Sequence, residues 1–314
     1  MSASGLPSSR REDSTMVLAE VTAQPGEEVL SGRRGSFARQ ILQRLRRDSS
    51  ALVGLSLVGL MVLLALVAPL IARYQPNAFD LTALNQGPSP RHWFGTDYLG
   101  RDMWSRVIYG GRTSLPAGLG VVAIALGVGA PLGLVAGYAG RLADDIIMRL
   151  MDCLLAFPGI LLAIGIVAIL GPSLTSSVIA VGVALIPGFA RIARGSTLQT
   201  REMDYVEAGR AQGGGTWHVL GRHILPNIVD PLIVYATLNL GLAILATAAL
   251  SFLGLGTQLP TSDWGTLLSN GYEHMFQSWG EVTFPGIAII ITVLGVNLLG
   301  DALGNAVDAR QWSR

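Results

Sequence analysis

Few side chains in this sequence have the types and spacing that enzymatic or metal chemistry requires. The four histidines are scattered without ligand spacing, and the single cysteine, Cys153, excludes an internal disulfide framework and a multi-cysteine metal site. All 22 basic residues are arginine, so the lysine with which a P-loop reaches nucleotide phosphates is absent. We therefore expect no catalytic residue, no metal site and no bound cofactor on this chain, and we interpret Cys153 as a small buried hydrophobe.

One polar segment, between Glu202 and Asn227, differs from the hydrophobic stretches around it. Asp204–Gln212 is predicted to form a short helix with Asp204 near its N-terminus. Three glycines from Gly213 end that helix, and a second short helix is predicted from Thr216 to His223, with Pro226 closing it. Two short helices around a glycine break predict a compact knob. From the residues alone, the knob fits a docking element and an ordinary ordered loop equally well.

The elements that position this segment are hydrophobic stretches long enough to cross a lipid bilayer. Of the 314 residues, 50% are hydrophobic and 14% are charged, whereas a soluble domain usually carries about 25% charged residues. Roughly 20 apolar residues cross the hydrocarbon layer, and Gly171–Ser177 divides one run that is too long for a single crossing. The sequence therefore predicts an all-α polytopic membrane protein with six transmembrane helices, within residues 51–72, 113–140, 153–190 (two helices), 231–262 and 282–300.

Arginine placement predicts the orientation of these spans. If the N-terminus is cytoplasmic, fifteen arginines lie near the membrane in inner segments and five in outer segments. We therefore expect a protein of the plasma or inner membrane with both termini on the cytoplasmic side. Phe37–Arg47 is predicted to be a basic amphipathic helix in the headgroup layer, or a solvated extension of the first span. The predicted parts are a cytoplasmic tail (1–50), a first helix (51–73), an extracytoplasmic loop (74–112), a five-helix core (113–306) with the cytoplasmic loop 196–227, and a cytoplasmic tail (307–314).

The predicted span interiors contain no Asp, Glu, Lys, Arg or His, which argues against a proton-coupled carrier. A transporter without its own titratable site takes its energy from elsewhere, so the cytoplasmic loops become the place to look. Gly127, Gly129, Gly133 and Gly137 indicate close helix packing. The alternative for these glycines is a permeation surface.

The polar segment resembles the EAA loop of bacterial ABC-importer membrane subunits, where Glu-Ala-Ala is followed by three residues, a glycine and a hydrophobic stretch ending in Leu-Pro. The matching residues are Glu207, Ala208, Gly213, Leu225 and Pro226. Gly209 stands where a second alanine is usual, a change that should lower helix stability by up to about 1 kcal/mol. The resemblance implies that this loop couples the spans to an ATPase.

From Arg46 onward the chain resembles the dipeptide/oligopeptide/nickel type of these permeases. The segments that carry this resemblance are Phe94–Arg106, Ser251–Gly256, Asp263–Gly265, Phe284–Gly286 and Asn297–Asp301. Near the end, Asp308-Ala309-Arg310 departs from the usual Asp-Pro-Arg. The resemblance implies the fold of a type I ABC importer permease.

That family membership would imply a set of partners. A second permease subunit forms a heterodimer with the chain, two ATP-binding subunits hold ATP and Mg²⁺, and an extracytoplasmic binding protein delivers the substrate. Di- and oligopeptides are the expected substrates, and glutathione, nickel complexes and oligosaccharides are also carried by such permeases. No nucleic acid is expected as a partner. The alternative function is a stand-alone secondary carrier or channel.

The resemblance also implies roles for the outer loops. These loops either meet the binding protein or brace the periplasmic face, and the residues concerned are Asp97, Arg101, Asp102, Asp263 and Trp264. A purely structural role is equally open for them, with salt bridges among the charged residues and Trp264 as an anchor at the membrane–water interface.

Overall fold

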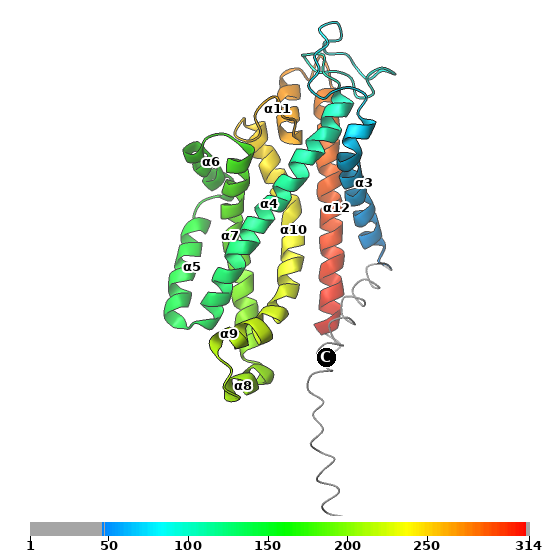
Figure 1. Ribbon diagram of the computed structural model, residues 1–314. Helices are drawn as coiled ribbons and strands as arrows, with labels where there is room; N and C mark the ends of the chain where they lie inside the picture. Colours follow the sequence, from blue (N-terminus) through cyan, green and yellow to red (C-terminus); the bar gives the residue numbers. More distant parts are fainter. Residues whose placement is uncertain (1–45, 47, 312–314) are drawn as a thin grey trace, which may run out of the picture. The chain divides into compact units, whose positions relative to one another are not determined.

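The computed structural model describes residue 46 and residues 48–311, with side chains described as far as Val307. All of these residues belong to one compact unit, Leu45–Arg314, whose regular structure is helical (Figure 1). Except for Arg46, the amphipathic helix predicted over Phe37–Arg47 lies outside the described residues. The helices are α3 (Ser49–Ile71), α4 (Met103–Tyr138), α5 (Arg141–Leu155), α6 (Gly159–Leu170), α7 (Leu174–Arg201), α8 (Asp204–Ala211), α9 (Thr216–Val219), the π-helical turn η1 (Leu220–Ile224), α10 (Leu225–Phe252), α11 (Trp264–Glu273) and α12 (Gly280–Gln311).

Five helical stretches of the described chain are long and apolar enough to cross a membrane. They are α3, α4, α7, α12 and the continuous stretch Thr216–Phe252. The pair α5 and α6, bent by 89° at its break, gives the sixth crossing when counted as one broken span. The predicted all-α polytopic architecture is therefore confirmed.

The second span begins at Met103 rather than near Thr113, so the end of the predicted extracytoplasmic loop is helical. Asp102 caps this helix by accepting a hydrogen bond from the Ser105 backbone N–H at 2.9 Å. The sequence prediction started the span at Thr113 because Arg112 ends the uncharged run. In the structure, Arg106 and Arg112 both lie inside α4, and Asp97 pairs with Arg106.

The third span differs from its prediction more strongly. The turn at Gly171–Ser173 is confirmed, but the preceding part starts at Arg141 and is broken again before Pro158. A proline lacks the N–H that a continuing helix needs, and it disfavours helical geometry in the residue before it. Cys153 near the end of α5 is exposed, so its interpretation as a buried residue was wrong.

Charged residues of this part of the bundle lie inside helices, but outside the apolar runs that were predicted as span interiors. Asp144 of α5 accepts two hydrogen bonds from Arg194 of α7, at 2.5 and 2.6 Å. Asp152 of α5 accepts one from Arg191 of α7 at 2.6 Å. The side chains of both ion pairs are partly exposed, and the two pairs link the amphipathic helix α5 to α7.

Glycines of α4 allow its close packing on α7. A Cβ atom at Gly133 would lie 2.7 Å from the Ala193 Cβ, and one at Gly137 would lie 2.7 Å from the Thr197 Cβ. Gly129 packs in the same way against Phe189. The packing interpretation is thus confirmed for these three positions. Gly127 has open space around it.

Candidate functional site

The predicted knob consists of α8, α9 and the turns around them, at the end of the molecule opposite α11 (Figure 1). Helix α8 starts at Asp204, as predicted, and carries Asp204 and Glu207 in its first turn. Carboxylates there interact favourably with the positive end of the helix dipole. Glu207 and Ala208 are exposed, whereas the preceding residue, Val206, is fully buried.

The glycine run ends α8 as predicted. Gly213 has φ of 84°, a left-handed conformation that favours glycine. Its N–H donates to the Arg210 carbonyl at 2.9 Å, and the Gly214 N–H donates to the Gly209 carbonyl at 3.1 Å. This pair of bonds is a Schellman motif, which satisfies carbonyl groups at the helix end and reverses the chain toward α9.

Pro226 does not close the second helix, contrary to the prediction. Helix α9 continues through η1 into α10, and Pro226 lies in the first turn of α10. The missing N–H and the bulk of the proline ring are accommodated by the wider π-helical turn, in which the Leu225 N–H donates to the Leu220 carbonyl. The knob is therefore a direct extension of a membrane-spanning helix.

Apolar side chains anchor the knob in the bundle. The buried anchors are Val206, Val219, Leu220 and Ile224, which belong to the same hydrophobic cluster as Phe189 of α7 and Leu232 of α10. The opposite surface carries large apolar side chains that are exposed, with Trp217 85% exposed and Met203, Tyr205 and Leu225 around half exposed. Exposed apolar groups of this size on a polar loop are typical of a protein–protein contact.

The glycine at position 209, where alanine is usual in the resembling loops, lies close to the His223 side chain. A Cβ there would lie 3.0 Å from His223 Nε2. The two side chains Tyr205 and His218 also face His223, with ring centroids 6.3 and 5.7 Å from it. Together with Ala208, Gln212 and Gly214, these residues line a shallow hollow of about 260 Å³ on the knob.

At the other end of the molecule, Asp97 joins two arginines in a buried cluster. Its Oδ2 accepts from Arg101 Nε at 2.7 Å and from Arg106 Nη1 at 2.5 Å, and its Oδ1 accepts from the Arg101 backbone N–H. Gly100 in this loop has φ of 74° and lies against the Asp80 backbone, where a side chain has no room. Hydrogen bonds from Thr82 lower the pKa of the exposed Asp80 carboxyl.

Asp102 and Asp263 both act as helix caps. Asp102 caps α4, and its other oxygen lies 2.9 Å from Nδ1 of the buried His92. Asp263 caps α11 by accepting from the Thr266 N–H at 2.9 Å. Arg106 Nε donates to Ser262 Oγ at 3.3 Å, which joins the Asp97 cluster to the loop before α11.

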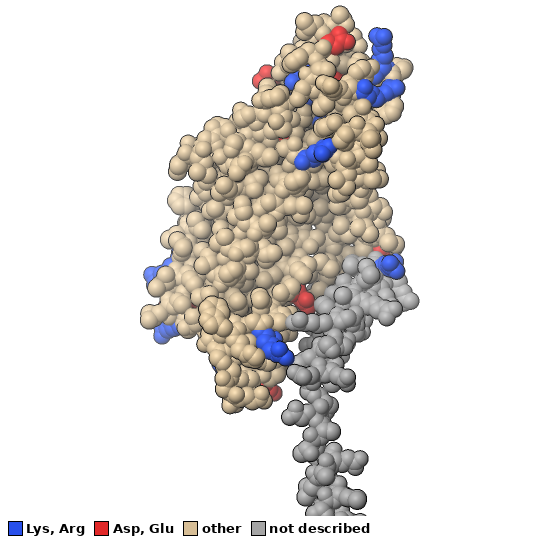
Figure 2. Space-filling model, in the orientation of Figure 1, with Lys and Arg blue, Asp and Glu red and all other residues tan. Residues whose placement is uncertain are grey.

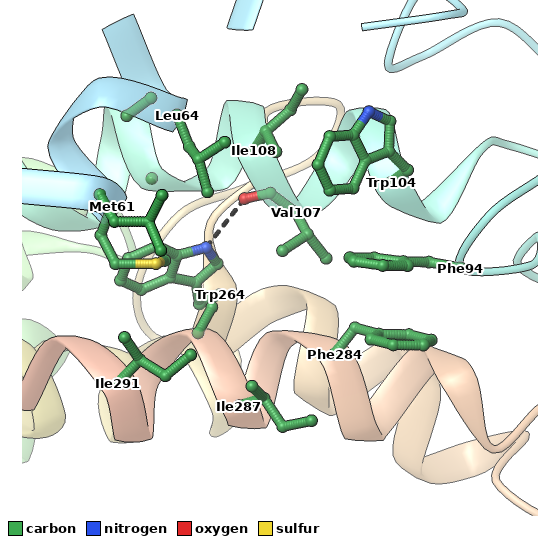
Figure 3. A pocket seen from close by; sticks show the side chains of 14 residues that line it. Met61, Leu64, Phe94, Trp104, Val107, Ile108, Trp264, Phe284, Ile287 and Ile291 are labelled. Carbon is green, nitrogen blue, oxygen red and sulfur yellow. Dashed lines mark hydrogen bonds between the residues drawn. The ribbon is translucent and has the colours of Figure 1, made fainter. Parts of the chain in front are cut away.

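Trp264 is buried among side chains of its own chain and does not reach lipid, contrary to its interpretation as an interface anchor. Its side chain is 0% exposed and donates its indole N–H to the Val107 carbonyl at 2.9 Å. Figure 3 shows it against an apolar cavity of about 130 Å³, in which Phe94 stacks on Phe284 and Met61 lies over Trp264. The outer-loop residues selected from the sequence are all buried in the described chain, an arrangement that favours bracing over direct contact with a partner.

Sequence reasoning missed two buried charged residues at this end of the molecule. Arg106 is the last residue of the segment Phe94–Arg106, which carries the family resemblance, but it was not chosen as a candidate site residue. It is 0% exposed. Glu281, at the start of α12, is also buried. The signal available for both was a charged residue at the edge of an apolar run, a pattern that equally fits a solvated end.

Two sequence families match this chain. Residues 129–313 match the family described as "Binding-protein-dependent transport system inner membrane component". The chain belongs to this family. Residues 36–88 match "N-terminal TM domain of oligopeptide transport permease C".

Relatives of this permease are close over most of its length. A dipeptide transport system permease protein of Alkalihalophilus pseudofirmus is 44% identical over 275 residues, which cover 88% of this chain and 90% of the relative. A probable D,D-dipeptide transport system permease protein of Escherichia coli is 44% identical over 81% of this chain and 85% of its own. A glutathione transport system permease protein of Pectobacterium atrosepticum is 43% identical over 87% and 91%.

The fold also matches a solved importer. A chain in a structure titled inward-facing conformations of the MetNI methionine ABC transporter aligns with a TM-score of 0.54 and 18% identity, covering 65% of this permease and 97% of that chain. The expected ABC-permease fold is thus confirmed. This protein is a membrane-spanning permease subunit of an ABC importer, and the stand-alone carrier or channel is not supported.

Proposed function

We propose that this permease subunit moves peptides across the membrane and that its knob docks on an ATP-hydrolysing partner. The observation that carries the docking proposal is the contrast between the two sides of the knob. Val206, Val219 and Ile224 are fully buried against the bundle, whereas Trp217 and Glu207 point outward. Because α9 continues into α10, a displacement of the knob moves a membrane-spanning helix directly.

The proposed complex contains a second permease subunit, two ATP-binding subunits and an extracytoplasmic binding protein. ATP and Mg²⁺ belong to the ATP-binding subunits, and this chain contributes no catalytic group. The family description, which names a binding-protein-dependent system, supports the external partner. The missing lysine supports placing nucleotide hydrolysis elsewhere.

We propose that the knob and both termini face the cytoplasm and that the Asp97 cluster faces outward. The excess of arginine in the inner segments supports this orientation. The proposed parts of the chain follow from it: tails at 1–50 and 307–314, an outer loop near 74–112, and a core that contains the coupling loop 196–227.

Peptides are the proposed substrate class because the relatives that match over most of this chain are named for dipeptides, D,D-dipeptides and glutathione. The first outcome to measure is uptake of a defined dipeptide by the assembled importer. Lack of dipeptide uptake by a complex that takes up another binding-protein ligand would reject the substrate class and leave the subunit role intact.

The docking proposal is tested by Glu207→Lys. Reversal of this exposed charge in the first turn of α8 opposes the helix dipole and alters the surface offered to the ATPase. We expect peptide uptake to fall at least tenfold, with normal amounts of the chain in the membrane. Uptake and substrate-stimulated ATP hydrolysis are measured with the purified complex in proteoliposomes.

A matched control is Asp145→Lys, which makes the same charge change at an exposed carboxylate on a different helix, α5. We expect this variant to keep most of the uptake. Equal uptake by Glu207→Lys and the wild type would reject the docking role of α8, as would transport by this chain alone after ATP depletion.

A further inference from the structure

Helix α4 has one face packed against its own chain and one face left open. Its packed face contacts α7 through Gly129 and Gly133, and Gly118 packs against Ile244 of α10. Exposed positions recur every three or four residues along the other side of the helix, at Arg112, Pro116, Leu119, Ala123, Gly127 and Pro131. Most of these side chains are short, so they leave space in front of the helix.

Arg112 lies on this open face below the outer end of the bundle. The Trp104 indole N–H donates to the Ile71 carbonyl at 3.3 Å, so the first turn of α4 is level with the outer end of α3. Arg112 is eight residues further along, which corresponds to about 12 Å of helix. Figure 2 shows a surface almost free of charge between its two ends, with a basic patch over the upper part of α4. Of the two arginines in the first three turns of α4, Arg106 is buried and Arg112 is exposed.

Arg112 has no acidic partner among the residues that the structure describes. The contact that it makes is with the ring of Tyr109 on the same face, 5.7 Å from its guanidinium carbon. Arg106 differs, because Asp97 pairs with it. Ionisable groups within membrane helices are costly against lipid, so they face aqueous cavities or partners and mark the paths of substrates.

We propose that Arg112 lines the aqueous translocation path and binds the carboxylate of the passing peptide. A guanidinium binds a carboxylate through two parallel hydrogen bonds, and every peptide with a free C-terminus presents that group whatever its side chains. Pro116, one turn further along the same face, has a short side chain and leaves room next to Arg112 for a substrate of variable size. This inference rests on the proposed peptide substrate.

Uptake of matched peptides tests the role of the guanidinium. The importer is assembled in proteoliposomes with the wild-type chain, R112Q or R112K. Uptake is measured for a dipeptide and for its C-terminal amide, and each peptide is supplied at a concentration that saturates the binding protein. We expect R112Q to lower uptake of the free dipeptide at least tenfold and uptake of the amide less than twofold. R112K, which keeps the charge but loses the two-point geometry, is expected to fall between.

The outcomes separate the two proposals. Dipeptide uptake by the wild type tests the substrate class, independently of Arg112. If wild-type uptake is present but R112Q lowers both peptides equally, Arg112 pairs with the second permease or a lipid headgroup, and the carboxylate role is overturned. Unchanged uptake of both peptides overturns it as well.

A labelling experiment tests the aqueous location without requiring transport. In the C153S background, R112C in the assembled complex is treated with a membrane-impermeant thiol reagent, and L66C on the exposed face of α3 is the control. We expect R112C to react, L66C to remain unlabelled, and dipeptide with binding protein and ATP to slow the reaction at position 112. Absence of labelling at R112C overturns the proposal.

Discussion

At the scale of single residues, the structure shows why charge near a membrane span is a poor guide to where the span begins. Arg106 is inside α4 and 0% exposed, yet Asp97 supplies its counter-charge. Asp97 also accepts hydrogen bonds from Arg101. One carboxylate is therefore the contacting counter-charge of two buried guanidinium groups, and its loss leaves both without an opposite charge in contact.

The prediction at this scale concerns Asp97→Asn. Removal of one partner from a buried ion pair usually costs on the order of 3–5 kcal/mol, because the remaining charge stays buried. We expect a loss of this size in the free energy of unfolding, measured by denaturant titration of the purified subunit in detergent. Asp145→Asn is the control, since its pair with Arg141 spans 3.9 Å between exposed side chains. A loss under about 0.5 kcal/mol for Asp97→Asn would show that the cluster tolerates an uncharged partner.

At the scale of elements, two glycine-dependent features position the coupling loop. Gly133 and Gly137 bring α4 onto α7, and α7 leads directly into α8. Gly213 then reverses the chain so that α9 returns to the bundle. The first feature depends on close approach and the second on backbone conformation, so substitutions should affect them for different reasons.

The prediction at this scale compares Gly133→Ala with Gly127→Ala. A Cβ at Gly133 meets Ala193 at 2.7 Å, while Gly127 has open space. Overpacking of this kind costs about 1–3 kcal/mol, so Gly133→Ala should lower the thermal stability of the subunit. Gly127→Ala should leave it unchanged or raise it slightly, because alanine favours helix. Equal effects of the two variants would contradict the packing interpretation.

At the scale of the whole molecule, the exposed apolar knob and the buried polar cluster lie at opposite ends of the bundle (Figure 1). A polytopic subunit needs different surfaces on the two sides of the membrane, because an energy-supplying partner and a substrate-delivering partner occupy different compartments. The arginine distribution sets the proposed direction.

The prediction at this scale is the labelling pattern of two single cysteines in a Cys153→Ser background. Trp217 on the knob and Phe276 after α11 are 85% and 95% exposed. In intact cells from which any outer membrane has been removed, Phe276→Cys should react with an impermeant thiol reagent. Trp217→Cys should react only after the cells are permeabilised. The reverse pattern would invert the proposed topology.

The amino-acid sequence by itself determined the features that depend on local patterns. Hydrophobic run length predicted the crossings, and the glycines at 213–215 predicted the end of α8, because both effects act over neighbouring residues. The tertiary structure decided whether a charge could enter a helix and whether an aromatic ring was buried. Asp144 and Arg194 pair across 50 positions of sequence, and Trp264 reaches Val107 across 157. The free energy of burying such groups depends on partners that are distant in the chain, which hydropathy along the sequence does not contain.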